Sequence, residues 1–113
     1  MENQERRRAD RREFRMQVVF RDDLNLNMAA SLNVSESGLL VSSDVSLDPG
    51  THIALFPLLD EMDPELYKLD GEVVRSCEDI MVSPYADDRF HMGIRLDLTE
   101  KQTEALRQFL GKN

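Results

Sequence analysis

Six short segments rich in β-branched and aromatic residues follow one another along the chain, and polar turn residues separate them. We expect strands at residues 16–21, 24–34, 39–43, 51–58, 67–76 and 90–96. The clearest turn is Asp48-Pro49-Gly50, where proline presets φ and glycine lets the chain reverse. Gly93 lies in the middle of the last expected strand, which predicts a bulge or a tight corner of the kind that a small barrel needs.

One amphipathic helix is expected after the last strand. Thr99 and Gln102 have the spacing of a capping box, and Gly111 is expected to end the helix. The apolar stripe of this helix consists of Leu98, Ala105, Leu106, Phe109 and Leu110. Strands in series that end in one helix predict an all-β fold, an antiparallel barrel or half-barrel with the helix packed on it.

The charged residues divide the chain into two parts. Its 113 residues carry 22 acidic and 14 basic side chains, and the net charge of −8 argues against a general affinity for nucleic acid or anionic membranes. Residues 1–21 hold seven arginines against four acids, whereas residues 22–113 hold seven basic and eighteen acidic side chains. We therefore expect a basic N-terminal arm at residues 1–15 and a single acidic domain at residues 16–113.

No feature of the sequence indicates a secreted, membrane-spanning or catalytic protein. Cys77 is the one cysteine, which excludes an intramolecular disulfide. No apolar run approaches the ~20 residues of a membrane span, and no apolar stretch of a signal peptide follows the basic N-terminus, so we expect a cytoplasmic location. No histidine, cysteine or carboxylate cluster has a recognisable spacing, so we expect neither an enzyme nor a bound metal or cofactor.

Residues 33–38, Asn-Val-Ser-Glu-Ser-Gly, are the strongest candidate for a ligand site. Asn33, Ser35 and Ser37 alternate with valine and glutamate, so at strand period their side chains leave the sheet on one face. Gly38 would permit a positive φ or the close approach of another group to the backbone. Taken alone, such a segment is most often a plain hairpin turn.

A second motif lies in the arginine-rich arm, where the spacing Arg-x-x-x-Arg occurs in three registers, Arg11/Arg15, Arg8/Arg12 and Arg7/Arg11. Together with Asn-x-Ser-x-x-Gly at residues 33–38, this motif resembles the signature of the PilZ domain family. The resemblance covers about residues 6–110, and residues 71–75 and 93–96 resemble two later strands of that family. We prefer the first register, because the arginine pair of the family directly precedes its first strand.

The resemblance implies a six-stranded antiparallel β-barrel with a C-terminal α-helix. It also implies a receptor or effector that binds the bacterial second messenger cyclic di-GMP and acts on a downstream protein partner. The ligand-binding residues that the resemblance implies are Arg11, Arg12, Arg15, Asn33, Ser35 and Gly38. Arginine suits this ligand because it pairs with guanine O6 and N7 or with phosphate, and also stacks on purines. The family usually has aspartate at the position of Asn33, and a neutral amide is a weaker acceptor than a carboxylate.

Two other functions are compatible with parts of the sequence. A PilZ-like adaptor that binds a protein but no nucleotide is the principal alternative. A small RNA-binding module could use the arginine arm, but the acidic domain lacks the paired aromatic residues on which single strands stack. We expect a monomer or a weak homodimer.

Overall fold

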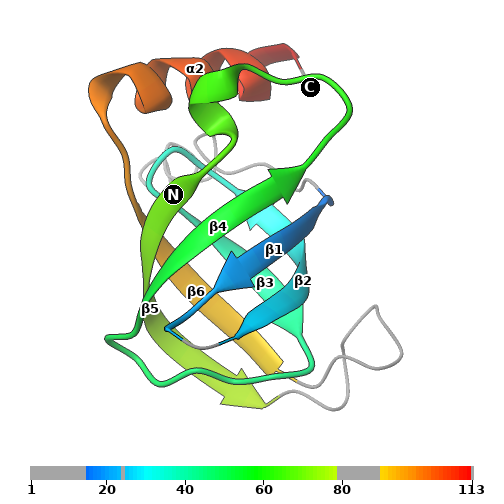
Figure 1. Cartoon of the computed structure of the whole chain (residues 1–113), viewed down its shortest axis with the longest axis vertical. Helices are drawn as coiled ribbons and strands as arrows, with labels where there is room; N and C mark the ends of the chain where they lie inside the picture. Colours follow the sequence, from blue (N-terminus) through cyan, green and yellow to red (C-terminus); the bar gives the residue numbers. More distant parts are fainter. Residues whose placement is uncertain (1–14, 24, 79–89, 113) are drawn as a thin grey trace, which may run out of the picture.

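The computed structural model describes residues 15–23, 25–78 and 90–112. These residues form a closed barrel of six antiparallel strands with one helix, α2, across one end (Figure 1). The strands are β1 (Gln17–Arg21), β2 (Leu26–Val34), β3 (Gly38–Ser43), β4 (His52–Leu58), β5 (Leu69–Glu78) and β6 (Phe90–Asp97). Their order around the barrel is β1-β2-β3-β6-β5-β4, and pairing of β1 with β4 closes it. The predicted fold class is confirmed.

The strand boundaries differ from the expected ones by no more than two residues, with the largest changes in β2 and β5. The strand β5 begins at Leu69 rather than at residue 67, because a 3-10 turn, η1 (Pro64–Leu66), precedes it. The side chain of Asp63 caps this turn by accepting a hydrogen bond from the amide of Glu65 at 2.9 Å. Tyr67 therefore ends the turn and does not start the strand.

Alternate residues of each strand fill the barrel. Val18, Phe20, Val41, Val73 and Met92 are each at most 1% exposed, and they come from the four strands β1, β3, β5 and β6. The side-chain period of two places their chain neighbours on the outer surface. The interior is thus a packed apolar core, and the outer wall of the barrel is the part that is open to a polar ligand.

The helix α2 (Glu100–Lys112) begins with the predicted capping box. The amide of Gln102 donates to Thr99 Oγ1 at 3.1 Å, and the amide of Thr99 donates to Gln102 Oε1 at 3.0 Å. The expected stop at Gly111 is wrong, because the helix continues to Lys112. Gly111 does not take up a left-handed conformation; among the described residues, the one glycine that does is Gly50 (φ 95°), in the predicted turn at 48–50.

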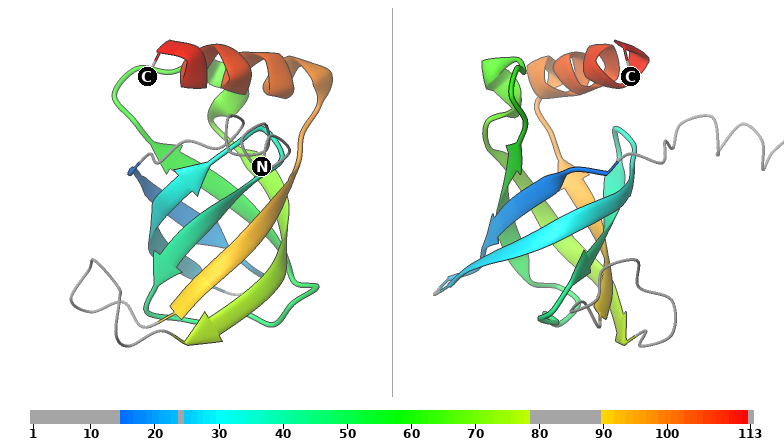
Figure 2. Two further views of the ribbon diagram at one scale, coloured as in Figure 1. Left: turned by 180° about the vertical axis from the view of Figure 1, so that it is seen from behind. Right: turned by 90° about the vertical axis from the view of Figure 1, so that its right-hand side faces the viewer.

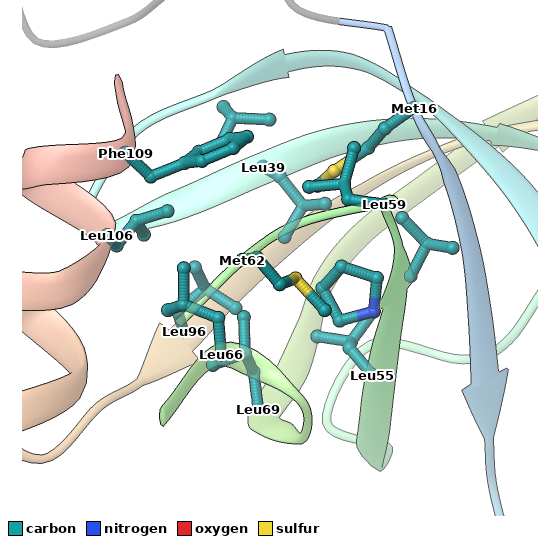
Figure 3. A pocket seen from close by; sticks show the side chains of 13 residues that line it. Met16, Leu39, Leu55, Leu59, Met62, Leu66, Leu69, Leu96, Leu106 and Phe109 are labelled. Carbon is teal, nitrogen blue, oxygen red and sulfur yellow. The ribbon is translucent and has the colours of Figure 1, made fainter. Parts of the chain in front are cut away.

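An apolar cleft lies where α2 meets the barrel (Figure 3). Leu106 and Phe109 point from α2 toward the barrel end, where Met16, Leu39 and Leu59 lie around the same space. All thirteen side chains that line the cleft are apolar, and the space left between them is about 20 Å³, roughly that of one water molecule. The apolar side chains around the cleft thus hold the helix on the barrel. The cleft itself is too small and too apolar for a polar ligand.

Candidate functional site

A bulge in β2 determines the direction of the Asn33 side chain. In the ladder with β3, the residue paired after Ser31 is Asn33, so Leu32 is an extra residue. Without a bulge, Asn33 would share the inward face with Ser31, which is 0% exposed. The bulge turns Asn33 to the outer face and returns Val34 to the core, where it is 2% exposed.

A second bulge, in β5, has the same effect on Arg75. The ladder with β6 passes from Val73 to Arg75, so Val74 is the extra residue. Val73 points inward and is 0% exposed, and alternation alone would also direct Arg75 into the core. Because of the bulge, Arg75 lies on the outer face opposite Gly93.

Asn33 and Arg75, from the two bulged strands, lie at the two ends of one row of paired residues that runs across the sheet. Asn33 pairs with Leu40, Leu40 pairs with Gly93, and Gly93 pairs with Arg75, so the row crosses β2, β3, β6 and β5. A hollow of about 250 Å³ lies over this row on the outer wall of the barrel. Its polar and charged lining consists of Asn33, Ser35, Ser37, Arg75 and Arg95. The structure thus brings Asn33, Ser35 and Gly38 together, with two arginines opposite them.

Two glycines lie in the floor of the hollow. A side chain at Gly38 would not fit, and a side chain at Gly93 would require the Arg75 side chain to shift. A Cβ on Gly38 would lie 2.5 Å from the backbone oxygen of Ile94. A Cβ on Gly93 would lie 3.0 Å from Nε and 3.1 Å from Cγ of Arg75. Of the two roles expected for Gly38, close approach is the one observed, because its φ is not positive. Gly93 leaves room for the Arg75 side chain to lie across it.

The turn between β2 and β3 is held by the hydroxyl of Ser35, which is 4% exposed. The amides of Ser37 and Gly38 both donate to Ser35 Oγ at 3.3 Å, and Oγ donates to the carbonyl of Gly38 at 3.2 Å. The carbonyl of Ser37 accepts from the amide of Leu96 at 2.9 Å, which attaches the turn to β6. Ser35 therefore shapes the turn from within, and Ser37, an exposed residue whose Oγ lies 3.1 Å from Ser35 Oγ, lines the hollow.

The two arginines of the hollow differ in their partners. Arg95 donates to Glu72 Oε1 at 2.6 Å and lies 3.5 Å from Asp97, so its charge is already compensated. In the part of the chain that the structure describes, no hydrogen bond or ion pair involves the guanidinium of Arg75. Arg75 is thus the cation that remains available to an anionic or guanine-like ligand.

Arg15, the last residue of the expected arginine arm, lies next to this turn. Arg11 and Arg12 lie outside the described residues, whereas Arg15 is described and exposed. The amide of Met16 donates to Ser31 Oγ at 3.0 Å, and the amide of Ser31 donates to the carbonyl of Met16 at 2.9 Å. Continuing this register places Arg15 opposite Leu32, next to Asn33.

A larger hollow of about 480 Å³ has the opposite charge. It is lined by four carboxylates, Asp22, Asp23, Asp70 and Asp97, against one guanidinium, Arg21. Such a surface repels phosphate groups. Within the described ranges, no group of three or more histidine, cysteine or carboxylate side chains could hold a metal ion, and no helix is long and apolar enough to cross a membrane.

Arg75 and Arg95 were not among the candidate site residues predicted from the sequence, although both lie in the segments that resemble later family strands. A strict alternation from Val73 assigns Arg75 to the interior, where an unpaired guanidinium would be very costly. That conflict was the available signal, because it indicates a bulge between the two residues.

Comparisons with known proteins agree with this architecture. The family model described as the PilZ domain matches residues 5–112. Among solved structures, the chain is similar to the PilZ domain of CeSA from a cellulose-synthesizing bacterium, with 15% identity and a TM-score of 0.60 over 89% of this chain and 95% of that one. It is also similar to the inhibitor of motility MotI/DgrA of Bacillus subtilis, with 18% identity and a TM-score of 0.61 over 91% of this chain. The match covers 51% of MotI/DgrA, so this chain spans about half of that protein. Among curated protein sequences, no relative matches.

Proposed function

This chain belongs to the PilZ domain family, and from that premise we propose that it is a cyclic di-GMP receptor whose ligand binds in the hollow between residues 33–38 and Arg75. The observation that carries the proposal is the guanidinium of Arg75, which has no described partner and lies at the opposite end of the cross-strand row from Asn33, with Gly38 and Gly93 among the residues of the floor. Such a floor lets a flat purine approach the backbone closely. PilZ domains are usually receptors for this messenger.

Each side of the hollow offers a different kind of hydrogen bond. Arg75 can donate two parallel bonds to guanine O6 and N7 or to a phosphate. On the other side, Asn33 can accept from guanine N–H groups through its amide oxygen, and Ser37 can donate to a phosphate. These groups complement a guanine with an adjoining phosphodiester.

The size of the hollow indicates that the barrel supplies only part of the site. Its volume of about 250 Å³ is below the ~300–1,000 Å³ that is typical of sites for drug-sized ligands. We assign the remaining contacts to the arm, through Arg11, Arg12 and Arg15. The position of Arg15 supports this assignment, because continuing the register of β1 places it next to Asn33 at the border of the hollow.

Binding that orders the arm over the turn would also create a new surface for a downstream protein partner. The cytoplasmic location, the oligomeric state and the expectation that the chain catalyses no reaction stay predictions.

Isothermal titration calorimetry with cyclic di-GMP tests the proposal, with GTP, cyclic GMP and a short RNA as competitors. We expect a dissociation constant in the micromolar range or below, that is, a binding free energy of about −8 kcal/mol or better. Arg75→Lys keeps the charge but loses the planar two-point donor, so it should bind more weakly than the native chain. Arg21→Lys, on the acidic hollow, is the matched control and should bind normally. No heat and no competition at saturating cyclic di-GMP would overturn the proposal.

One observation favours the adaptor that binds protein and no nucleotide. Met28, Val19 and Phe56 are neighbours on the outer face of β2, β1 and β4, and Leu58 on the same face is 47% exposed. Exposed apolar side chains that lie together are typical of protein contact surfaces. The two functions predict different results in the calorimetric titration, because an adaptor of this kind binds its partner without responding to cyclic di-GMP.

A further inference from the structure

A two-point ion pair joins the β2–β3 turn to the helix α2. Nη2 of Arg107 donates to Glu36 Oε1 at 2.7 Å, and Nε donates to Oε2 at 3.1 Å. The two residues are 71 positions apart in the sequence. Both turn and helix lie at the same end of the barrel, as the two views in Figure 2 show.

The pair lies on the side of the turn that faces away from the hollow. Ser35 and Ser37 line the hollow, whereas Glu36 between them does not. Two contacts between described residues attach the turn to other elements: the hydrogen bond from Leu96 to the carbonyl of Ser37 and the ion pair of Glu36 with Arg107. Removal of Arg107 would leave the first attachment and release the second.

The helix α2 is attached to the barrel by hydrogen bonds of its first turn and by its buried apolar side chains. Its first turn is fixed by Gln102, whose Nε2 donates to the carbonyls of Glu65 and Lys68 at 3.2 and 3.0 Å. Below it, Ala105, Leu106 and Leu110 are buried. Among the described residues, no backbone hydrogen bond connects α2 to the β2–β3 turn, so the polar connection there is made by Arg107.

We propose that Arg107 is a positioning residue for the ligand site: through Glu36 it holds residues 33–38 in the conformation that receives the ligand. The identity of the ligand rests on the proposed function, whereas the ion pair between Glu36 and Arg107 does not depend on it. Coupling of this kind is reciprocal, so a ligand that stabilises the turn also stabilises the helix end that holds it. The position of α2 would then report occupancy of the hollow to a partner.

Arg107→Gln tests the inference, with Lys101→Gln as the matched control. Lys101 is exposed on the same helix, and its substitution removes the same charge without touching Glu36. Arg107→Gln should weaken cyclic di-GMP binding by about two- to fivefold, as is usual for exposed ion pairs, and Lys101→Gln should have no effect beyond general charge. The difference between the variants should shrink at high salt.

Amide hydrogen exchange in the absence of ligand gives a readout that does not depend on the proposed function. The amides of Ser35 and Gly38 form hydrogen bonds across the turn, at 2.8 and 3.3 Å, and we expect both to exchange faster in Arg107→Gln than in Lys101→Gln. The charge swap Glu36→Arg with Arg107→Glu should restore slow exchange in part, because the side chain at position 107 also lies 3.4 Å from the carboxylate of Glu104.

The outcomes separate the two proposals. If the native chain fails to bind cyclic di-GMP, the proposed function is wrong, and the exchange of Ser35 and Gly38 still decides whether Arg107 positions the turn. If the native chain binds, while Arg107→Gln binds equally well and leaves that exchange unchanged, the positioning role is overturned and the receptor function stands. Melting curves of each variant are the control that checks whether the fold is intact.

Discussion

The side chain of Arg75 lies across Gly93, with Cγ and Nε 3.1 and 3.0 Å from the point where a Cβ would be. This contact joins β5 to β6 on the outer wall and directs the guanidinium over the hollow. A residue with a side chain at position 93 would have to displace the arginine. The close approach thus makes the glycine and the arginine a single structural unit.

We expect Arg75→Ala to weaken cyclic di-GMP binding about 10- to 100-fold, the loss expected for hydrogen bonds to charged groups. Gly93→Ala should weaken binding in the same direction although it removes no polar group, because the new methyl group displaces Arg75. Calorimetry of the two single variants and the double variant tests whether the two residues act together. The losses of binding free energy in the single variants should sum to more than the loss in the double variant. Independent, additive losses would contradict it.

Gly38→Ala should destabilise the barrel by about 1–3 kcal/mol, because its Cβ would lie 2.5 Å from a backbone oxygen that cannot move alone. Gly111→Ala is the control, since nothing lies within 4 Å of that Cβ and the residue is helical. Alanine there should stabilise the protein by up to about 1 kcal/mol. Urea denaturation measures both, and a neutral Gly38→Ala would show that the strands can separate without cost.

Ser35→Ala removes the hydroxyl that accepts from two amides in the turn, so we expect a loss of stability of about 1–3 kcal/mol. Ser37→Ala, at an exposed hydroxyl, should leave stability within about 0.5 kcal/mol. If ligand affinity falls in both variants while stability falls only in the first, the two serines have the roles that the geometry indicates. Equal losses of stability would contradict this division.

In the arm, Arg11→Ala and Arg15→Ala should each cost about 2–5 kcal/mol of ligand binding if each forms a buried charged hydrogen bond in the complex. Arg6→Ala and Arg7→Ala should act through long-range charge only, with an effect that fades as salt rises. Titrations at low and high salt measure all four. Equal losses from Arg7 and Arg15 would show that another Arg-x-x-x-Arg register is used.

The pH dependence of the turn follows from Glu36. The hydrogen bonds from Arg107 hold the pKa of this carboxyl below its ordinary value of 4.5. Desolvation opposes them, and the charge of Arg107 lowers the pKa further by a smaller amount. A depressed pKa means that the pair contributes its full stabilisation above the ordinary value and loses it as pH falls through the lowered pKa. Carboxyl carbon chemical shifts should therefore titrate at higher pH in Arg107→Gln than in the native chain. An unchanged titration would show that the pair does not persist in solution.

The sequence by itself determined the elements of this protein. The six strands were predicted within two residues, because β-branched and aromatic residues and the turn at Asp48-Pro49-Gly50 mark them locally. The capping box at Thr99 and Gln102 was predicted for the same reason, since its hydrogen bonds join residues three apart. The polar turn at residues 33–38 was also identified from its own residues.

Only the tertiary structure decided how these elements form a site. An alternating pattern does not show where a strand takes an extra residue, so the bulge at Leu32, which turns Asn33 outward, was not predicted. A bulge or tight corner was expected at Gly93, but the extra residue, Val74, lies on the paired strand β5, where it turns Arg75 outward. The pairing of Gly93 with Arg75 depends on the register at which the barrel closes, which no local segment specifies. The same holds for Glu36 and Arg107, because two residues 71 positions apart meet only when the helix packs across the end of the closed barrel.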